Sequence, residues 1–302
     1  MISASYVGAA GRRLLQSAWI ASPNPNFNNA QLVGDTAASD YNSLQVQFQR
    51  RLSRGLQMLA SYTWSHSIDD ASAGSFGNFA NTLGAGLHSG ADRGPSDFDI
   101  RNAFSSALTY DIPAPKWNSW GRAALGGWSV ESIVQARSAL PVNLSVGTSS
   151  LVVGNRVQLR PDLVAGQSRY LLGAEFPGGK AFNPAAFTAP PVDPKTGEAS
   201  RQGDLGRNAM RGFSATQWDL GIHREFRLRE LARLQFRAEF FNVLNHPNFA
   251  PPVADLSQPN FGLSTQTLGQ YLAGQNVGGG GFNSLYQTGG PRSIQLALKF
   301  MF

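Results

Sequence analysis

Cysteine is absent from the 302 residues of this chain, so neither a disulfide framework nor a thiolate metal site can form. No apolar run approaches the roughly 18 residues of a membrane-spanning helix. Charged residues make up only 15% of the chain, and its net charge of +6 is spread along it without a basic block. A nucleic-acid-binding tail is therefore not expected. These absences leave open a membrane β-barrel, whose strands give a weaker signal than a helix does.

The start of the chain lacks a targeting segment. Residues Met1 to Gly8 already alternate like a β-strand. No charged region, apolar region or cleavage site of a secretory signal precedes them. A protein bound for the outer membrane must carry such a signal. The sequence therefore predicts either a chain that is not exported or the back part of a longer protein.

The clearest pattern that is present lies at the C-terminus. Five apolar residues alternate with others there, namely Ile294, Leu296, Leu298, Phe300 and Phe302. A period of two places one set on each face of a strand. A strand of about ten residues with one apolar face crosses the bilayer in an outer-membrane barrel, whereas the alternative is an ordinary edge strand. Leu296, Leu298, Phe300 and Phe302 also resemble the C-terminal signal by which the barrel-assembly machinery recognises its clients.

Similar alternation recurs along the chain and predicts about eight antiparallel strands in a meander. Long loops are expected at residues 23–40, 67–100, 140–215 and 245–290. Short or middling connections are expected near Arg54, Trp117 and Glu230, and Gly55 suits the positive φ of a hairpin loop. Long loops at one end and short turns at the other are typical of outer-membrane barrels, with the long loops outside the cell.

The two faces of these strands differ in character. The face expected to meet lipid carries Leu44, Phe48, Met58, Trp64, Phe104, Trp128, Leu220, Phe236, Phe240 and Leu298. Aromatic side chains on this face fall at two levels, as two membrane interfaces select. Tyr62, Trp64 and Trp218 lie at long-loop ends, and Tyr110, Trp128 and Phe302 lie at short-turn ends.

The opposite face is polar and is expected to line the lumen. It carries Asp219, His223, Glu225, Arg237 and Glu239 on the strands of one hairpin. We expect Glu225 to pair with Arg237, and His223 to lie near Glu239, because residues of the same parity meet across a hairpin.

Several stretches resemble the C-terminal barrel of TonB-dependent outer-membrane receptors, of the Oar-like type with a carboxypeptidase-regulatory-like domain. These stretches are Tyr6-Val7-Gly8 with Arg12 and Leu14-Leu15, Tyr41–Gln45, Ser61–Ser65, Asp92–Arg101, Gly127-Trp128 and, most specifically, Phe236–Phe249. Together they cover nearly the whole chain. Asn102 stands where the family pattern has histidine.

The resemblance implies that residues 1–302 are the C-terminal portion of a barrel of about 22 strands with a plugged lumen. In this interpretation the chain is a fragment without plug, signal peptide or N-terminal domain. It supplies the wall and extracellular loops of an active transporter for an unknown substrate, energised by TonB through the missing plug, and is not transport-competent alone. Its sheet is then an open curved wall. The expected partners are the lipid bilayer and the barrel-assembly machinery. The alternative is a complete eight-stranded barrel acting as an adhesin or structural protein.

Catalytic, cofactor and metal sites are not predicted, because no HExxH, GxSxG or metal-ligand spacing occurs. His66 with Asp69 or Asp70 could form a catalytic pair, but a solvated loop histidine is favoured. Asp97 and Asp99 could bind calcium, yet they lack the spacing of a calcium loop, so a capped turn is favoured. The run Gly278–Gly281 lacks a phosphate-loop lysine and is interpreted as loop.

Overall fold

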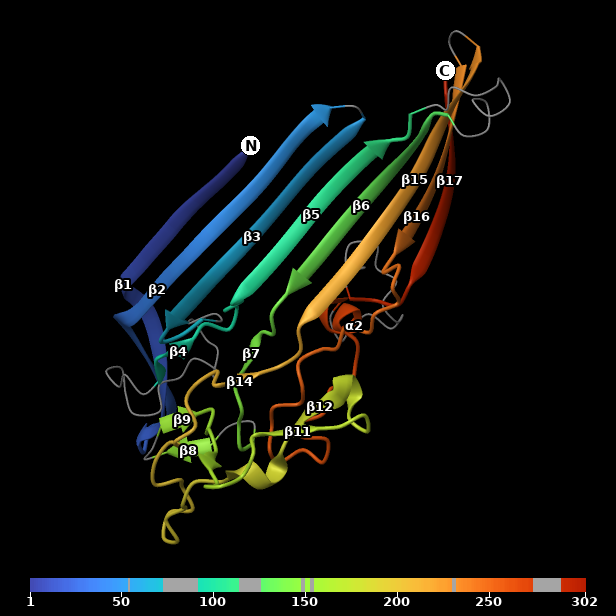
Figure 1. Cartoon of the computed structure of the whole chain (residues 1–302). Helices are drawn as coiled ribbons and strands as arrows, with labels where there is room; N and C mark the ends of the chain where they lie inside the picture. The colour runs from blue at the N-terminus through green and yellow to red at the C-terminus, as the bar shows by residue number, and fades with distance from the viewer. Residues whose placement is uncertain are drawn as a thin grey trace.

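A computed structural model describes residues 1–53, 55–72, 92–113, 126–147, 150–152, 155–229, 232–273 and 289–302. Eight long strands form one antiparallel meander, which confirms the predicted all-β fold (Figure 1). They are β1 (Ile2–Asn24), β2 (Phe27–Ser53), β3 (Leu56–Asp69), β5 (Asn102–Asp111), β6 (Trp128–Arg137), β15 (Ala215–Arg229), β16 (Ala232–Phe241) and β17 (Ser293–Met301). Their order in the sheet is β17-β16-β15-β6-β5-β3-β2-β1, so each strand pairs with the next long strand of the chain.

The strand register sorts the side chains of this wall onto two faces. Leu44 lies opposite Trp64, Tyr62 opposite Phe104, and Phe236 opposite Leu298. Because partners across a ladder point to the same side of a sheet, even-numbered residues share one face from the start of β1 through β17. All ten residues predicted to face lipid are even-numbered and lie on this face, which we call the apolar face. The odd-numbered residues form the polar face.

The strand ends that flank the predicted short connections lie at one end of the wall, together with both chain termini (Figure 1). There the backbone N–H of Asp111 donates to the carbonyl oxygen of Gly55 at 2.8 Å. Gly55 has φ of 80°, and a Cβ atom at this position would lie only 2.5 Å from the backbone carbonyl oxygen of Asp111. The turn therefore requires glycine. The predicted turn positions Arg54, Trp117 and Glu230 themselves lie outside the described residues.

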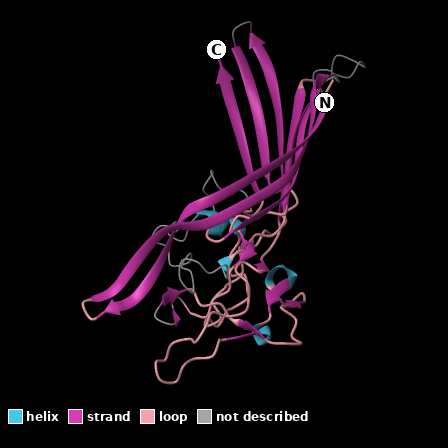
Figure 2. Cartoon of the chain, turned by 90° about the vertical axis from the view of Figure 1, so that its left-hand side faces the viewer, coloured by secondary structure: helices cyan, strands magenta, loops and turns pink. Residues whose placement is uncertain are grey.

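The prediction of a loop at residues 23–40 is wrong. Strand β1 runs to Asn24 and β2 begins at Phe27, so that stretch forms the distal part of a long β-hairpin. About ten residues of a strand suffice to cross a bilayer, and β1 has 23. The residues beyond that length do not contact lipid, so their sequence need not alternate between apolar and polar side chains. The pairing of β1 with β2 shifts register after Gly11 and again after Leu14. Figure 2 shows a long two-stranded hairpin reaching away from the wall.

The wall is open rather than closed into a ring. Strand β17 pairs only with β16, and β1 pairs with β2 and, near its distal end, with β9 (Asn155–Val157). Among the described residues no ladder joins β1 to β17. This confirms the expectation of an open sheet in the structure.

The end opposite the termini carries a packed body of short elements, which we call the loop unit and define as residues 138–147, 150–152, 155–214 and 242–273 (Figure 2). Its strands are β7 (Pro141–Val142), β8 (Ser150–Val152), β9, β10 (Asp162–Leu163), β11 (Tyr170–Leu172), β12 (Lys180–Phe182), β13 (Phe187–Thr188) and β14 (Met210–Arg211). Two 3-10 turns (Pro177–Gly179 and Pro184–Ala186) and helix α2 (Leu268–Ala273) complete it. In the described part of the chain, no helix has the length and apolar character needed to span a membrane.

Candidate functional site: the clamped loop unit

The loop unit has its own apolar core, although its strands are only two or three residues long. The buried cluster comprises Val142, Leu144, Phe182, Ala186, Phe187, Leu205, Met210 and Phe261. The ring of Phe261 lies 6.2 Å from that of Phe182 and 5.9 Å from that of Phe187, within the range of favourable aromatic pairs. The stretch 140–215 is therefore irregular, as expected, but much of it is packed.

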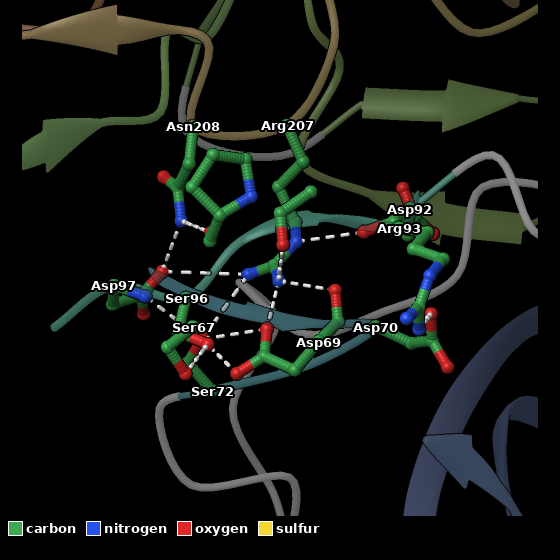
Figure 3. Close-up of polar contacts among 12 residues, drawn as sticks. Ser67, Asp69, Asp70, Ser72, Asp92, Arg93, Ser96, Asp97, Arg207 and Asn208 are labelled. Carbon is green, nitrogen blue, oxygen red and sulfur yellow. Dashed lines mark hydrogen bonds and ion pairs between the residues drawn. The ribbon is translucent and has the colours of Figure 1, made fainter. Parts of the chain in front are cut away.

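One arginine ties this unit to the wall. Arg207 is only 5% exposed, and its Nη2 donates to the carboxylate and, at 2.8 Å, to the backbone carbonyl of Asp69 at the end of β3. Its Nε donates at 2.7 Å to the carbonyl oxygen of Asp92 (Figure 3). The remaining nitrogen lies 3.3 Å from Ser72 Oγ and 3.4 Å from a carboxylate oxygen of Asp97. A buried guanidinium needs this many acceptors, because it has five donors and has left water.

Three neighbouring side chains repeat the arrangement. Arg160 binds the Asp92 carboxylate, and both side chains are almost fully buried. Arg211 binds the Asp99 carboxylate and, at 2.8 Å, its backbone carbonyl. Asn208 donates to Asp97 at 2.6 Å and to the carbonyl of Pro95, in the short strand β4 (Gly94–Pro95) that pairs with β3, at 2.8 Å. We call this network the clamp, comprising Arg160, Arg207, Asn208 and Arg211 with Asp69, Asp92, Asp97 and Asp99.

Asp99 is the most enclosed carboxylate of the clamp. Burial raises the pKa of its carboxyl group, but hydrogen bonds from Arg211, from the Ser67 backbone and from His66 outweigh this, so the pKa lies below its ordinary value. His66 Nδ1 lies 3.1 Å from the carboxylate. His66 therefore sits on strand β3 beside Asp99, rather than in a loop or paired with Asp69 or Asp70.

The clamp is built to hold segments together rather than to react. Each of its carboxylates already has an arginine or asparagine partner. Asp97 and Asp99 belong to a turn in which the Asp99 N–H donates to the Ser96 carbonyl at 2.9 Å, as the capped-turn interpretation predicts. The described residues contain no group of three or more histidines and carboxylates arranged to hold a metal ion. The run Gly278–Gly281 lies outside the described residues.

Sequence reasoning singled out the stretch 92–101 but missed its partners. Arg207 and Asp69 are 138 residues apart in the chain, and Arg211 and Asp99 are 112 apart. A usable signal existed, because the stretch has three aspartates that need counter-charges, and residues 201–211 supply three arginines. Spacing alone could not pair them.

The predicted aromatic residues lie where the register requires. Tyr62, Trp64, Trp218, Tyr110 and Trp128 all belong to the apolar face. The Tyr62 hydroxyl donates to Asn102 Oδ1 at 2.7 Å, and Trp218 Nε1 donates to Ser132 Oγ at 2.9 Å. Trp128 packs edge-on against Phe236, with ring centroids 6.2 Å apart. Their role at membrane interfaces stays a prediction.

The predicted pairing on the polar face needs correction. Asp219, His223, Glu225, Arg237 and Glu239 share this face, but Glu225 pairs with Arg233 at 3.0 Å instead of Arg237. Arg237 pairs with Glu239 at 2.8 Å and with Glu131 of β6 at 3.2 Å. His223 also approaches Glu131, at 3.6 Å. The register places Arg237 opposite His223, and the unforeseen partner Glu131 on the neighbouring strand takes the role assigned to Glu225.

The predicted C-terminal signal residues are highly exposed. Leu298 is 71% and Phe302 is 98% exposed, and Leu296 and Phe300 are also exposed. Apolar side chains of this size in contact with water are unfavourable, so this side of β17 needs a lipid or protein environment.

An antiparallel meander with one apolar and one polar face, short turns at one end and long loops at the other, is the wall of a transmembrane β-barrel. The chain matches the family described as outer membrane beta barrel domain over residues 1–275, and it belongs to that family. Its location is the outer membrane.

Two further comparisons complete this result. No curated protein sequence matches the chain. Among solved structures the chain is similar to the outer membrane transporter YddB from Escherichia coli, with 10% sequence identity and a TM-score of 0.49. The alignment covers 99% of this chain and 30% of that one, so the chain spans less than a third of that transporter's length.

Proposed function

We propose that this chain supplies wall and extracellular loops of a TonB-dependent active transporter, and that it works as the C-terminal portion of a larger barrel. The resemblance of its motifs to Oar-like receptors motivates the finer assignment. In such a transporter the substrate enters from the long-loop end, and TonB acts through a plug that this chain does not contain. The chain alone is then not transport-competent.

The two unpaired edges of the wall carry this proposal. An exposed strand edge in the bilayer leaves backbone N–H and C=O groups without partners, at a cost of several kcal/mol for each group. Along β17 one side is paired with β16 and the other is open in the described structure. Further strands between β17 and β1 would satisfy both edges.

The clamp fits the same function. A transporter needs outer loops that keep a fixed shape over the lumen mouth, because a binding site on unanchored loops loses affinity to ordering entropy. Arg207 and Arg160 fix the loop unit to the end of β3 and to the segment around Asp92. The loop unit is therefore a rigid surface for first contact with substrate.

The alternative is a complete eight-stranded barrel with an adhesive or structural role. In that case β1 and β17 must pair directly when the chain inserts into a membrane. The two functions thus make opposite predictions for one pair of strands, although both place the chain in the outer membrane.

Disulfide cross-linking distinguishes the two, and the absence of native cysteine makes the background clean. Cysteine is placed at Ser5 of β1 and, in separate variants, at Gln295, Ala297 and Lys299 of β17, all on the polar face. Ser5 with Gln45, direct partners in the β1–β2 ladder, serves as the positive control. The assay is performed on outer membranes of cells that make the protein.

The transporter wall predicts cross-linking of Ser5→Cys with Gln45→Cys and none with the three β17 positions. Efficient cross-linking of β1 to β17 contradicts the larger barrel and favours the eight-stranded alternative, because a disulfide requires Cα atoms within about 7 Å. TonB dependence is tested separately, by comparing uptake through the larger barrel that this chain is proposed to complete in cells with and without an active TonB system.

A further inference from the structure

Arg137, the last residue of β6, is a cation for which the described residues provide no counter-charge. Its direct cross-strand neighbours on the polar face are Ala103 of β5 and Ala215 of β15. Alanine offers neither charge nor hydrogen bond, so the guanidinium has no carboxylate in the positions where a sheet normally supplies one.

Two other arginines of the polar face are paired. Arg233 binds Glu225, and Arg237 binds Glu131 and Glu239. Arg137 is partly buried, and within the part of the chain that the structure describes it has no hydrogen bond or ion pair through its side chain. A partly desolvated guanidinium without an acceptor is unfavourable, so an acceptor from outside the chain would stabilise it.

Two carboxylates toward the long-loop end of the wall already have partners. Asp99 is bound by Arg211, and Asp219 accepts hydrogen bonds from Gln217 and from the backbone of Asn242.

Arg137 lines a pocket of about 190 Å³ at the long-loop end of β5, β6 and β15. The other lining residues are uncharged, and those on the same face as Arg137 give apolar surface from Ala103 and Ala215 and amide groups from Gln135 and Gln217. Arg137 is thus the single charge of this pocket. A site with one guanidinium beside apolar surface matches a carboxylate carried on a compact apolar body.

We propose that the pocket at Arg137 binds a small organic anion, with the guanidinium holding its carboxylate and the surface of Ala103 and Ala215 on the same face holding its apolar part. This inference rests on the proposed transport function, since it names the substrate class that the long-loop end of the wall would accept. The site lies where the loop unit meets the strands, because Arg137 also lines a smaller pocket with Phe213 and Phe249.

The probe for this site is 4-fluorobenzoate, and its uncharged counterpart is 4-fluorobenzamide. Binding to the whole chain folded in detergent micelles is followed by fluorine NMR. We expect the wild-type chain to bind the benzoate and to bind the benzamide at least about 10-fold more weakly, because a charge-assisted bidentate hydrogen bond is lost.

Variants assign the effect to one side chain. Arg137→Gln should weaken benzoate binding about 10-fold or more, while Arg137→Lys should retain part of it because the charge remains. Arg233→Gln is the matched control, since it removes an arginine of the same face that already has Glu225 as partner, and it should bind like the wild type. If Arg137→Gln fails to fold, the comparison of wild type with Arg137→Lys and with the benzamide carries the test.

Equal binding of benzoate and benzamide, or unchanged benzoate binding by Arg137→Gln, overturns the anion site. Either result leaves the transporter proposal standing, because that proposal is tested by cross-linking of β1 and β17 and by TonB-dependent uptake. Conversely, a direct β1–β17 cross-link removes the larger transporter while the anion site can still bind.

Discussion

At the scale of single residues, Arg207 is the arginine whose buried charge most needs its acceptors within the fold. It is buried with Asp69, and removing it leaves that carboxylate without its cation. We predict that Arg207→Met destabilises the docked loop unit by about 3–5 kcal/mol, the usual cost of breaking a buried ion pair from one side. Limited proteolysis of the folded protein measures this, because a released loop unit is cleaved faster.

Arg201 provides the control for that substitution. It pairs with Asp162 within the same loop unit, but its side chain is half exposed. Arg201→Met should leave stability nearly unchanged, because exposed ion pairs contribute little. Equal proteolysis of the two variants would contradict the role of the clamp.

The clamp should also respond to acid through Asp99. Its pKa is lowered in the folded chain, so its ionised form stabilises docking at pH values above the unfolded-state pKa of about 4. This contribution is lost as the pH falls through the lower, folded-state pKa. The Ser67 amide donates to Asp99. We expect the protection of this amide against hydrogen exchange, measured relative to its intrinsic rate at each pH, to fall in that pH range. In Asp99→Asn the same amide should be less protected at neutral pH and show no such acid transition.

At the scale of elements, strands that touch lipid on one side were predictable and the others were not. Strand β16 alternates because Phe236 and Phe240 share the apolar face with Leu298 and Ile294 of β17. The distal β1–β2 hairpin lacks that constraint, so residues 23–40 gave no strand signal. The loop unit was unpredictable in detail, because its core and clamp join residues more than a hundred positions apart.

The sidedness of β16 can be tested with an introduced charge. Phe236 lies mid-strand on the apolar face, packed edge-on against Trp128 and opposite Arg224. Phe236→Arg should destabilise the protein in a bilayer, but by less than the roughly 2–4 kcal/mol found at the midplane, because Phe236 packs against Trp128 at the predicted interface level. Repulsion from Arg224 adds to the cost. The measurement is denaturant unfolding from lipid vesicles.

The neighbouring residue gives the matched control for the apolar face. Gln235 lies on the polar face of the same strand, opposite Glu225. Gln235→Arg should therefore be nearly neutral or slightly stabilising. A larger loss of stability for Gln235→Arg than for Phe236→Arg would mean that lipid covers the other face.

At the scale of the whole molecule, the wall and the loop unit have different roles. The wall offers one face to lipid and one to water, and the clamp holds a compact body across its long-loop end. The alternation of apolar and polar side chains in the wall is local in sequence, so it could be predicted from the sequence alone. The partners on the polar face could be predicted only in part. Glu131 comes from β6, which borders the β15–β16 hairpin in the sheet but lies about a hundred residues from Arg237 in the chain.

Deletion of the last residue, Phe302, can test assembly in cells separately from the stability of the folded wall. Phe302 is almost fully exposed and contacts mainly the ring of Phe300, with centroids 6.0 Å apart, so its removal should cost the finished wall little. If the C-terminus is the signal read by the barrel-assembly machinery, deleting Phe302 should reduce insertion in cells several-fold. The same variant should still fold into lipid vesicles without the machinery, at the wild-type yield. Phe98→Ala, which removes another exposed phenylalanine in the loop before β5, should insert normally in both settings. An equal loss for the Phe302 deletion in vesicles and in cells would mean that this ring stabilises the wall instead of guiding its assembly.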